Sequence, residues 1–329
     1  MYNFMKYLCF INILKINNFI KNITSYILSI ITKKVYVYGK PSFASFELSS
    51  RCNLNCPQCD VGNNLTNRKN NFINYENYCK IIDEIGTTLL DAIFYFQGEP
   101  LLNKNFSKYI SYAKQYNIYT ITSTNAQLIN KNIATEIVKS GLDRIIISID
   151  GTTQEVYETY RKGGSLKKCI EAIKFLKETK KELKSKTPCI EAQFIVFRFN
   201  EHQISEFKQL APKWGADKIS IKLAQIHSPN ENFEIIPTIN KYSRYHKINS
   251  EWKIKKDYSK ACFRAWNGIV ISADENILPC CFDKQEKHIY GNIKEDTIEN
   301  IWKNKKANDF RNIVLNNRSS INMCTNCNE

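Results

Sequence analysis

Short runs of β-branched and aromatic residues recur between residues 43 and 223, and helical patterns separate them. The runs have the length of strands, and the segments between them place apolar residues at helical spacing. Such an alternation predicts an α/β fold with a parallel sheet and helices outside it. The predicted strands are Phe43–Leu48, Ala92–Phe96, Ile118–Thr122, Arg144–Ile149, Ile190–Phe197 and Lys218–Leu223, and the predicted helices are Tyr75–Ile85, Asn105–Asn117, Asn130–Ser140, Leu166–Lys181 and Glu201–Trp214.

Three cysteines, Cys52, Cys56 and Cys59, follow the first predicted strand at the spacing C-x3-C-x2-C. Parallel barrels place their active sites at the carboxyl ends of the strands, where this motif lies. Three thiolates can hold three irons of a 4Fe–4S cluster, which normally takes four cysteine ligands. The next cysteine, Cys79, lies beyond an Asn-rich stretch, so one iron would be left for a ligand that is not protein. Short cysteine spacings also bind zinc, which is the alternative interpretation.

The motif resembles that of the radical S-adenosylmethionine (SAM) enzymes. In that family the methionine part of SAM chelates the open iron, and reductive cleavage releases a 5′-deoxyadenosyl radical. The resemblance covers roughly residues 42–329. It implies a partial (β/α)6 TIM-like barrel, a 4Fe–4S cluster on Cys52, Cys56 and Cys59, and SAM as a cofactor.

The resemblance also implies SAM contacts in the loops after the next three strands. Gln97-Gly98-Glu99-Pro100 stands where the family usually has Gly-Gly-Glu-Pro, so the chain departs from the pattern at Gln97. Asn125 is followed by Ala126, whereas relatives often have Asn-Gly. Relatives use a Ser and a downstream Arg to bind SAM, which here are Ser148 and Arg161. Turn and helix-capping roles are the alternatives for several of these positions. The implied cofactor-binding residues are Gln97, Gly98, Glu99, Asn125, Ser148 and Arg161.

A second group of cysteines lies beyond residue 261, around a predicted hairpin and a helical segment at Thr297–Leu315. This stretch resembles the SPASM or twitch auxiliary-cluster domain, which follows the barrel in many radical SAM enzymes. The resemblance implies a second, fully ligated 4Fe–4S cluster, and structural zinc is the alternative. Cys281 competes with Cys280 for one ligand position, and Cys281 and Asp283 are candidates for a catalytic role. The implied ligands are Cys262, Cys280, Cys324 and Cys327.

The first 34 residues are rich in apolar side chains, but lysines and asparagines interrupt them. No run approaches the ~18–20 apolar residues of a transmembrane helix, and no signal-peptide pattern is present. This pattern predicts an amphipathic helix that packs on its own domain. Membrane-surface contact through residues 1–34 is the alternative. The net charge of +15 comes from scattered lysines without a nucleic-acid-binding motif, so we expect no nucleic-acid partner.

Together with the resemblance, these patterns divide the chain into an N-terminal helical segment (1–41), a radical SAM barrel (42–225), a linker (226–261) and an auxiliary cluster domain (262–329). Twelve cysteines without the pattern of a disulfide scaffold indicate a reducing, cytoplasmic location, with a membrane-peripheral one as the alternative.

The family implies an oxidoreductase or maturase that abstracts a hydrogen atom from a small molecule or a peptide. The auxiliary cluster would transfer electrons, and a flavodoxin or ferredoxin would supply them. The alternative from another class is a non-catalytic redox or structural protein that binds iron–sulfur clusters or zinc.

Overall fold

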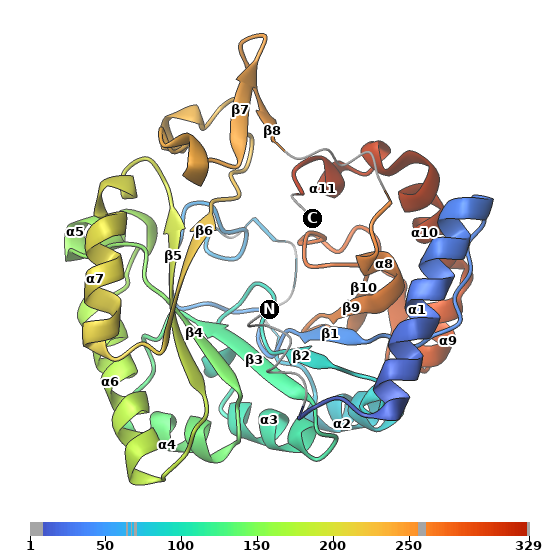
Figure 1. Ribbon diagram of the computed structural model, residues 1–329, viewed down its shortest axis with the longest axis horizontal. Helices are drawn as coiled ribbons and strands as arrows, with labels where there is room; N and C mark the ends of the chain where they lie inside the picture. Colours follow the sequence, from blue (N-terminus) through green and yellow to red (C-terminus); the bar gives the residue numbers. More distant parts are fainter. Residues whose placement is uncertain (1–8, 64, 67, 69–70, 256–260, 328–329) are drawn as a thin grey trace.

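The computed structural model describes residues 9–63, 65–66, 68, 71–255 and 261–327. Its frame is a nine-stranded sheet in the order β11-β10-β9-β1-β2-β3-β4-β5-β6 (Figure 1). Strands β1 to β6 are parallel to their neighbours, and helices α2 to α7 lie outside them. The predicted α/β fold with a partial barrel is therefore confirmed.

The barrel elements follow the predicted order, with shifted ends. Strands β1 and β2 end earlier than predicted, at Phe46 and Ile93, although Leu48 and Phe94 beyond them are buried and complete the apolar pattern. The short helix α5 was not predicted. The strands are β1 Phe43–Phe46, β2 Asp91–Ile93, β3 Tyr119–Thr124, β4 Arg144–Ser148, β5 Cys189–Val196 and β6 Lys218–Leu223, and the helices are α2 Tyr75–Ile85, α3 Phe106–Lys114, α4 Lys131–Lys139, α5 Gln154–Tyr160, α6 Leu166–Glu182 and α7 Ile204–Trp214.

The predicted C-terminal module is present, and its first strand extends the barrel sheet. Strand β9 pairs in parallel with β1, and β10 and β11 follow in antiparallel order. The predicted helix Thr297–Leu315 is two helices, because the Asn304 side chain accepts a hydrogen bond from the Ala307 amide and starts a new one. The elements are α8 Arg264–Asn267, β9 Gly268–Ile271, β10 Asn276–Leu278, β11 Gly291–Asn292, α9 Ile298–Lys303, α10 Lys305–Asn317 and α11 Asn322–Thr325.

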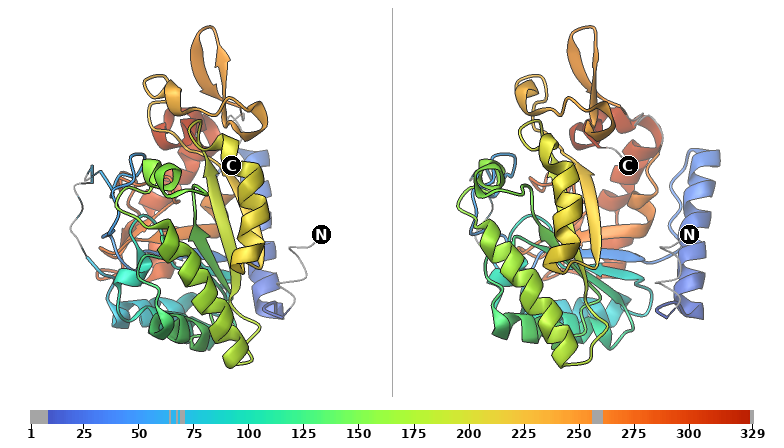
Figure 2. Two further views of the ribbon diagram at one scale, coloured as in Figure 1. Left: turned by 90° about the vertical axis from the view of Figure 1, so that its left-hand side faces the viewer. Right: turned by 60° about the vertical axis from the view of Figure 1, so that its left-hand side comes forward.

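Two further segments pack around this frame. The segment predicted as a linker carries an antiparallel hairpin, β7 (Tyr245–Ile248) and β8 (Glu251–Ile254), which projects beyond the barrel in Figure 1. The N-terminal helix α1 (Ile13–Thr32) lies along the side of the molecule, separate from the barrel helices (Figure 2). Of the helices described, none has the length and apolarity needed to cross a membrane.

Candidate active site

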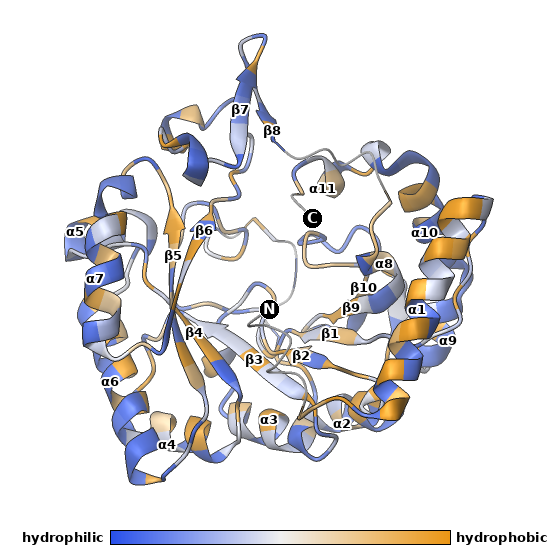
Figure 3. Cartoon of the chain, in the orientation of Figure 1, coloured by the Kyte–Doolittle hydropathy of each residue, from blue (hydrophilic) through white to orange (hydrophobic). Residues whose placement is uncertain are grey.

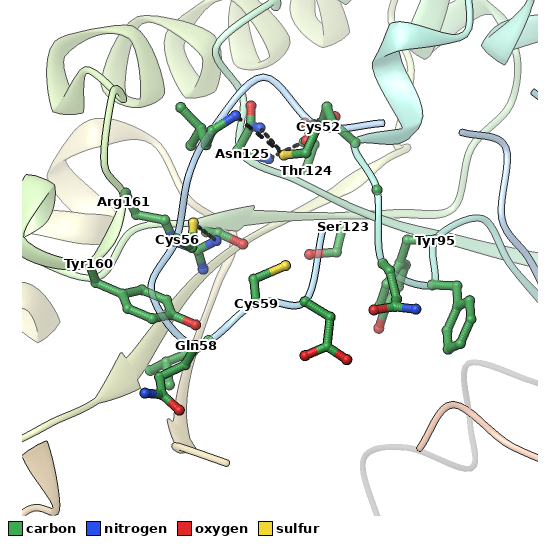
Figure 4. Close-up of a pocket in the computed structure, with 18 of the residues that line it drawn as sticks. Cys52, Cys56, Gln58, Cys59, Tyr95, Ser123, Thr124, Asn125, Tyr160 and Arg161 are labelled. Atoms are coloured by element: carbon green, nitrogen blue, oxygen red, sulfur yellow. Dashed lines mark hydrogen bonds between the residues drawn. The ribbon is translucent and has the colours of Figure 1, made fainter. Parts of the chain in front are cut away.

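A cavity of about 230 Å³ opens at the carboxyl ends of the barrel strands. It contains the three cysteines of the first motif and all six residues predicted to bind SAM (Figure 4). Most of the other lining residues flank these predicted ones, whereas Ile195 and Lys284 were not predicted because they are far from the motifs along the chain. The lining residues are Cys52, Leu54, Cys56, Gln58, Cys59, Asp60, Tyr95, Phe96, Gln97, Gly98, Glu99, Ser123, Thr124, Asn125, Ser148, Tyr160, Arg161, Ile195 and Lys284.

The cysteine loop follows β1 and is held by its own backbone. The Cys59 amide donates to the Cys56 carbonyl, and the Asn63 side chain donates to the carbonyls of both residues. Burial raises the pKa of Cys52 to about 11 and also raises the pKa of Cys56. Iron binding must therefore displace protons from these thiols, because thiolate is the form that binds a metal.

The donor set of this loop fits a cluster. Among the residues that the structure describes, no three His, Cys, Asp or Glu side chains converge closely enough to hold a single metal ion. A 4Fe–4S cluster takes one thiolate on each iron, so its ligands do not have to meet at one point. Cys52, Cys56 and Cys59 supply three such ligands around one cavity.

Gly98 and Glu99 attach the loop after β2 to the cysteine loop. The Glu99 amide donates to the Arg51 carbonyl at 2.7 Å, next to Cys52. A Cβ atom at Gly98 would lie 2.0 Å from the Ser49 carbonyl oxygen, so only glycine fits there. The sequence predicted this glycine for a close approach to SAM, whereas the approach that the structure shows is to the neighbouring backbone.

The Glu99 carboxylate is buried and organises the loop after β3. Its Oε1 accepts from the Thr124 hydroxyl at 2.6 Å and from the Leu101 amide at 3.2 Å, and its Oε2 accepts from the Asn125 amide at 2.8 Å. Burial raises the pKa of Glu99, and these donors oppose that shift. The Asn125 side chain donates to Asn53 at 2.8 Å and lies 3.7 Å from the Cys52 sulfur.

At Ala126, in the loop after β3, the chain departs from the family pattern. Its φ is +61°, in the left-handed region that favours glycine, which relatives often have at this position. Its amide donates to the Thr124 hydroxyl, which keeps the loop in this conformation.

Arg161 lines the cavity and forms a buried ion pair with Asp150. Its Nε lies 2.6 Å from Oδ2 of Asp150, a fully buried residue just after β4, and its Nη1 lies 3.8 Å from the Cys56 sulfur. Asp150 also accepts from the Ile195 amide at 2.7 Å. Burial raises the pKa of Asp150 and the Arg161 charge opposes it. The sequence did not predict this ion pair, although an acidic residue two positions after Ser148 is a signal for a partner of Arg161.

The cavity wall includes residues from distant segments. The Gln97 side chain donates to the Lys284 carbonyl at 2.7 Å, so this departure from the family's glycine joins the barrel to the C-terminal module. Asp60 accepts from Gln285 at 3.0 Å and lies 3.1 Å from Nε2 of His227. His227 belongs to the segment predicted as a linker, which therefore reaches the cysteine loop.

The second cysteine group surrounds a small cavity of about 30 Å³. Cys262, Cys280, Cys324 and Cys327 all line it, whereas Cys281 does not. Burial raises the pKa of Cys280 far above its usual value and also raises that of Cys324. Four thiols around one space fit a fully ligated 4Fe–4S cluster.

The two candidate catalytic residues of this module have different surroundings. Asp283 is buried, and its two carboxylate oxygens accept from the amides of Lys287 and His288, both at 2.9 Å. It lines neither of the two cavities described above. Cys281 lies close enough to Tyr95 to contribute, after burial, to the raised pKa of this tyrosine, which lines the large cavity.

Comparisons with known proteins agree with this geometry. The model of the radical SAM superfamily matches residues 46–194, and that of SPASM, an iron–sulfur cluster-binding domain, matches residues 262–328. The chain is similar to BtrN in complex with AdoMet and 2-DOIA (18% identity, 88% of this chain and 93% of that chain, TM-score 0.53). It is also similar to Streptococcus suis SuiB bound to S-adenosylmethionine (15% identity, 88% of this chain and 71% of that chain, TM-score 0.64).

A third similar structure is native anSMEcpe with bound AdoMet and Cp18Cys peptide (17% identity, 84% of each chain, TM-score 0.58). At these identities the structures show a shared fold. The family matches carry the assignment further, because they include both cysteine groups. The chain belongs to the radical SAM superfamily, as an enzyme with a C-terminal SPASM domain whose cofactors are SAM and 4Fe–4S clusters.

Proposed function

We propose that this protein is a radical SAM oxidoreductase that removes a hydrogen atom from a C–H bond of a small polar substrate. The observation that carries the proposal is the single cavity that joins Cys52, Cys56 and Cys59 to the three loops after β2, β3 and β4. No fourth cysteine and no histidine is among the described residues that line it. When bound, the cluster and SAM supply reductive cleavage of SAM and the 5′-deoxyadenosyl radical that takes the hydrogen atom.

The residues of the chain bind and orient SAM. Arg161 offers a cation for the SAM carboxylate, because Asp150 holds its guanidinium beside Cys56. Glu99 offers an acceptor for the SAM ammonium, because its Oε2 accepts one bond and has a second lone pair. Ser148 and Asn125, both lining the cavity, would hydrogen-bond to the rest of the cofactor.

The auxiliary site on Cys262, Cys280, Cys324 and Cys327 serves electron transfer. Its four thiols would fill every iron of a cubane, which leaves none to bind the substrate. An electron from the oxidised substrate would pass to this cluster, and a flavodoxin or ferredoxin would reduce the first one. Cys281 is our candidate for a role at the substrate, because it does not line the auxiliary cavity and contributes to the raised pKa of Tyr95, which lines the large cavity.

The polar lining of the cavity supports the substrate class. Gln58, Asp60 and Lys284 line it beside the cysteine loop. Such groups suit a substrate with hydroxyl or amino groups. A peptide is the second candidate, since the similar anSMEcpe was solved with a bound peptide.

The test is anaerobic reconstitution with iron and sulfide, followed by iron analysis and a SAM-cleavage assay with a strong reductant. We expect about eight irons per chain. Cys56→Ser should lose about four irons and all SAM cleavage, whereas Cys280→Ser should lose about four irons and keep SAM cleavage. Cys9→Ser, at an exposed cysteine that lines neither cavity, is the control. Two zinc ions per chain without SAM cleavage would instead support a non-catalytic metal protein.

A further inference from the structure

Helix α1 is amphipathic, but its polar side faces the domain and its apolar side faces outward. Its buried side is polar, with Lys15, Asn18, Asn22, Ser25 and Ser29 facing the domain. Its outer face is apolar and largely hydrophobic in colour along the helix in Figure 3. Five exposed isoleucines follow one another at intervals of three, four, seven and four residues, which places them on one side of the helix. They are Ile13, Ile16, Ile20, Ile27 and Ile31, with 67%, 42%, 54%, 48% and 71% of their surface exposed.

Hydrogen bonds fix the helix in this orientation. Asn18 and Asn22 both donate to the Lys40 carbonyl at 2.9 Å and to the Ser42 hydroxyl at 3.0 Å. Lys15 donates to the Asn117 carbonyl at 2.6 Å. Rotating the helix to bury its isoleucines would break these bonds and leave buried polar groups unpaired. The apolar outer face is therefore a stable feature of the folded protein.

The charged residues of the N-terminal segment that carries this face are all of one sign. Residues 1–46 contain six lysines and no Asp or Glu. Lys21, Lys33 and Lys34 are exposed on or beside α1, whereas Lys40 is paired with Glu299 at 2.9 Å. An apolar helix face with basic flanks matches the chemistry of an anionic lipid surface.

We propose that α1 docks the protein on the surface of an anionic lipid bilayer through this outer face. The helix lies in the plane of the interface, because its polar side remains bonded to the domain. A symmetric dimer is a poorer occupant, since it would bring two like-charged lysine clusters together. The N-terminal half of the helix bonds to residues just before β1 and β3, and Tyr26 bonds to the Ala261 carbonyl, whereas the active-site cavity lies at the carboxyl ends of the barrel strands. Docking would therefore leave the cavity open to the aqueous side.

The test is sedimentation of the full-length reconstituted protein with vesicles. One set contains phosphatidylcholine alone, and the other contains equal parts of phosphatidylcholine and phosphatidylglycerol. We expect binding to the anionic set only, weaker at high salt because screening reduces surface attraction. Ile16→Ser/Ile20→Ser/Ile27→Ser should abolish binding. Lys21→Gln/Lys33→Gln/Lys34→Gln should weaken it by about fivefold or more for each lysine at the surface.

The matched control is Ile239→Ser/Ile248→Ser/Ile313→Ser, at isoleucines outside α1 with 41%, 42% and 40% exposure. It should bind as the unaltered protein does, and both isoleucine variants should keep their iron content. No binding to anionic vesicles, or equal loss in the control, would overturn the proposal. So would a change from dimer to monomer in the α1 variant, measured by light scattering, without any vesicle binding by the unaltered protein.

Discussion

At Gly98 the backbone lies so close to the cysteine loop that a Cβ atom would be 2.0 Å from the Ser49 oxygen and 2.6 Å from the Arg51 oxygen. Both contacts are to backbone, which cannot rotate away as a side chain can. The position therefore couples the loop after β2 to the geometry of Cys52. Iron binding should be sensitive to a single methyl group here.

We predict that Gly98→Ala loses iron at the first cluster and destabilises the fold by about 1–3 kcal/mol, as overpacking of a tight site does. Iron per chain and thermal unfolding would measure the two effects. Gly268→Ala is the control, because a Cβ atom there meets its nearest neighbour at an ordinary 3.6 Å. Full iron content in Gly98→Ala would show that the loop can move aside.

Lys15 is a buried lysine whose pKa is lowered to about 8 by burial and by the charge of Lys114. Below pH 8 the folded and unfolded states both hold the proton, and the buried charge costs stability. Between pH 8 and 10.5 only the unfolded state still holds it, so this contribution to stability rises with pH. Above that window the cost has disappeared.

We predict that the free energy of unfolding of the unaltered protein, relative to that of Lys15→Met, rises by about 2–3 kcal/mol between pH 7 and pH 10. Chemical denaturation at several pH values would measure it. Lys21→Met, at an exposed lysine of the same helix, is the control. A difference that stays flat over this range would mean that Lys15 keeps its proton in the folded state.

At the scale of elements, the helices of the SPASM domain meet at one buried cation. Arg311 of α10 is fully buried and donates to the carbonyls of Ala265 in α8 at 2.9 Å and of Trp302 in α9 at 2.7 Å. Its guanidinium also lies 4.0 Å from the centre of the Trp302 ring. Burial lowers the pKa of Arg311 to about 10. One side chain thus joins three helices near the auxiliary cysteines.

We predict that Arg311→Met destabilises the fold by about 2–4 kcal/mol, because two buried carbonyls lose their donor. The auxiliary cluster should also lose iron, since the Cys262 segment leads into α8. Denaturant unfolding and iron analysis would test both points. Lys306→Met, at an exposed position of α10, should change stability by no more than about 0.5 kcal/mol.

At the scale of the whole molecule, the barrel and the SPASM domain share one sheet. Strand β9 pairs with β1 over four residues, Phe43 to Phe46, so the C-terminal module covers an edge of the barrel. Gln97 adds a hydrogen bond to the Lys284 carbonyl across the same junction. Removing the module would expose an unpaired parallel edge next to the cluster loop.

We predict that a chain ending at residue 255 aggregates, whereas full-length protein with Cys262, Cys280, Cys324 and Cys327 all changed to Ser stays folded. Size-exclusion chromatography and circular dichroism would distinguish them. The physical reason is that the second variant keeps β9 on β1 while it loses only the cluster ligands. A monomeric, folded truncated chain would show that the barrel is stable with an open edge.

Local patterns predicted much of this site. The spacing of Cys52, Cys56 and Cys59, the Gly98-Glu99 turn and the position of Ser148 near the end of a strand could all be predicted from neighbouring residues. The partners of these residues could not. The Asp150–Arg161 pair was not predicted, because neighbouring residues do not show which side chains pair. His227 was placed in a linker, because its contact Asp60 is far away in the sequence.

The sequence by itself determined the order of strands and helices, the cluster loop and the membership of the family, since periodicity and ligand spacing are properties of short segments. Only the tertiary structure decided that Cys280 rather than Cys281 lines the second cavity, that β9 continues the barrel sheet, and that α1 turns its polar side inward. The physical reason is that burial and pairing depend on what an element packs against. A helical pattern shows two faces and does not say which one meets the protein.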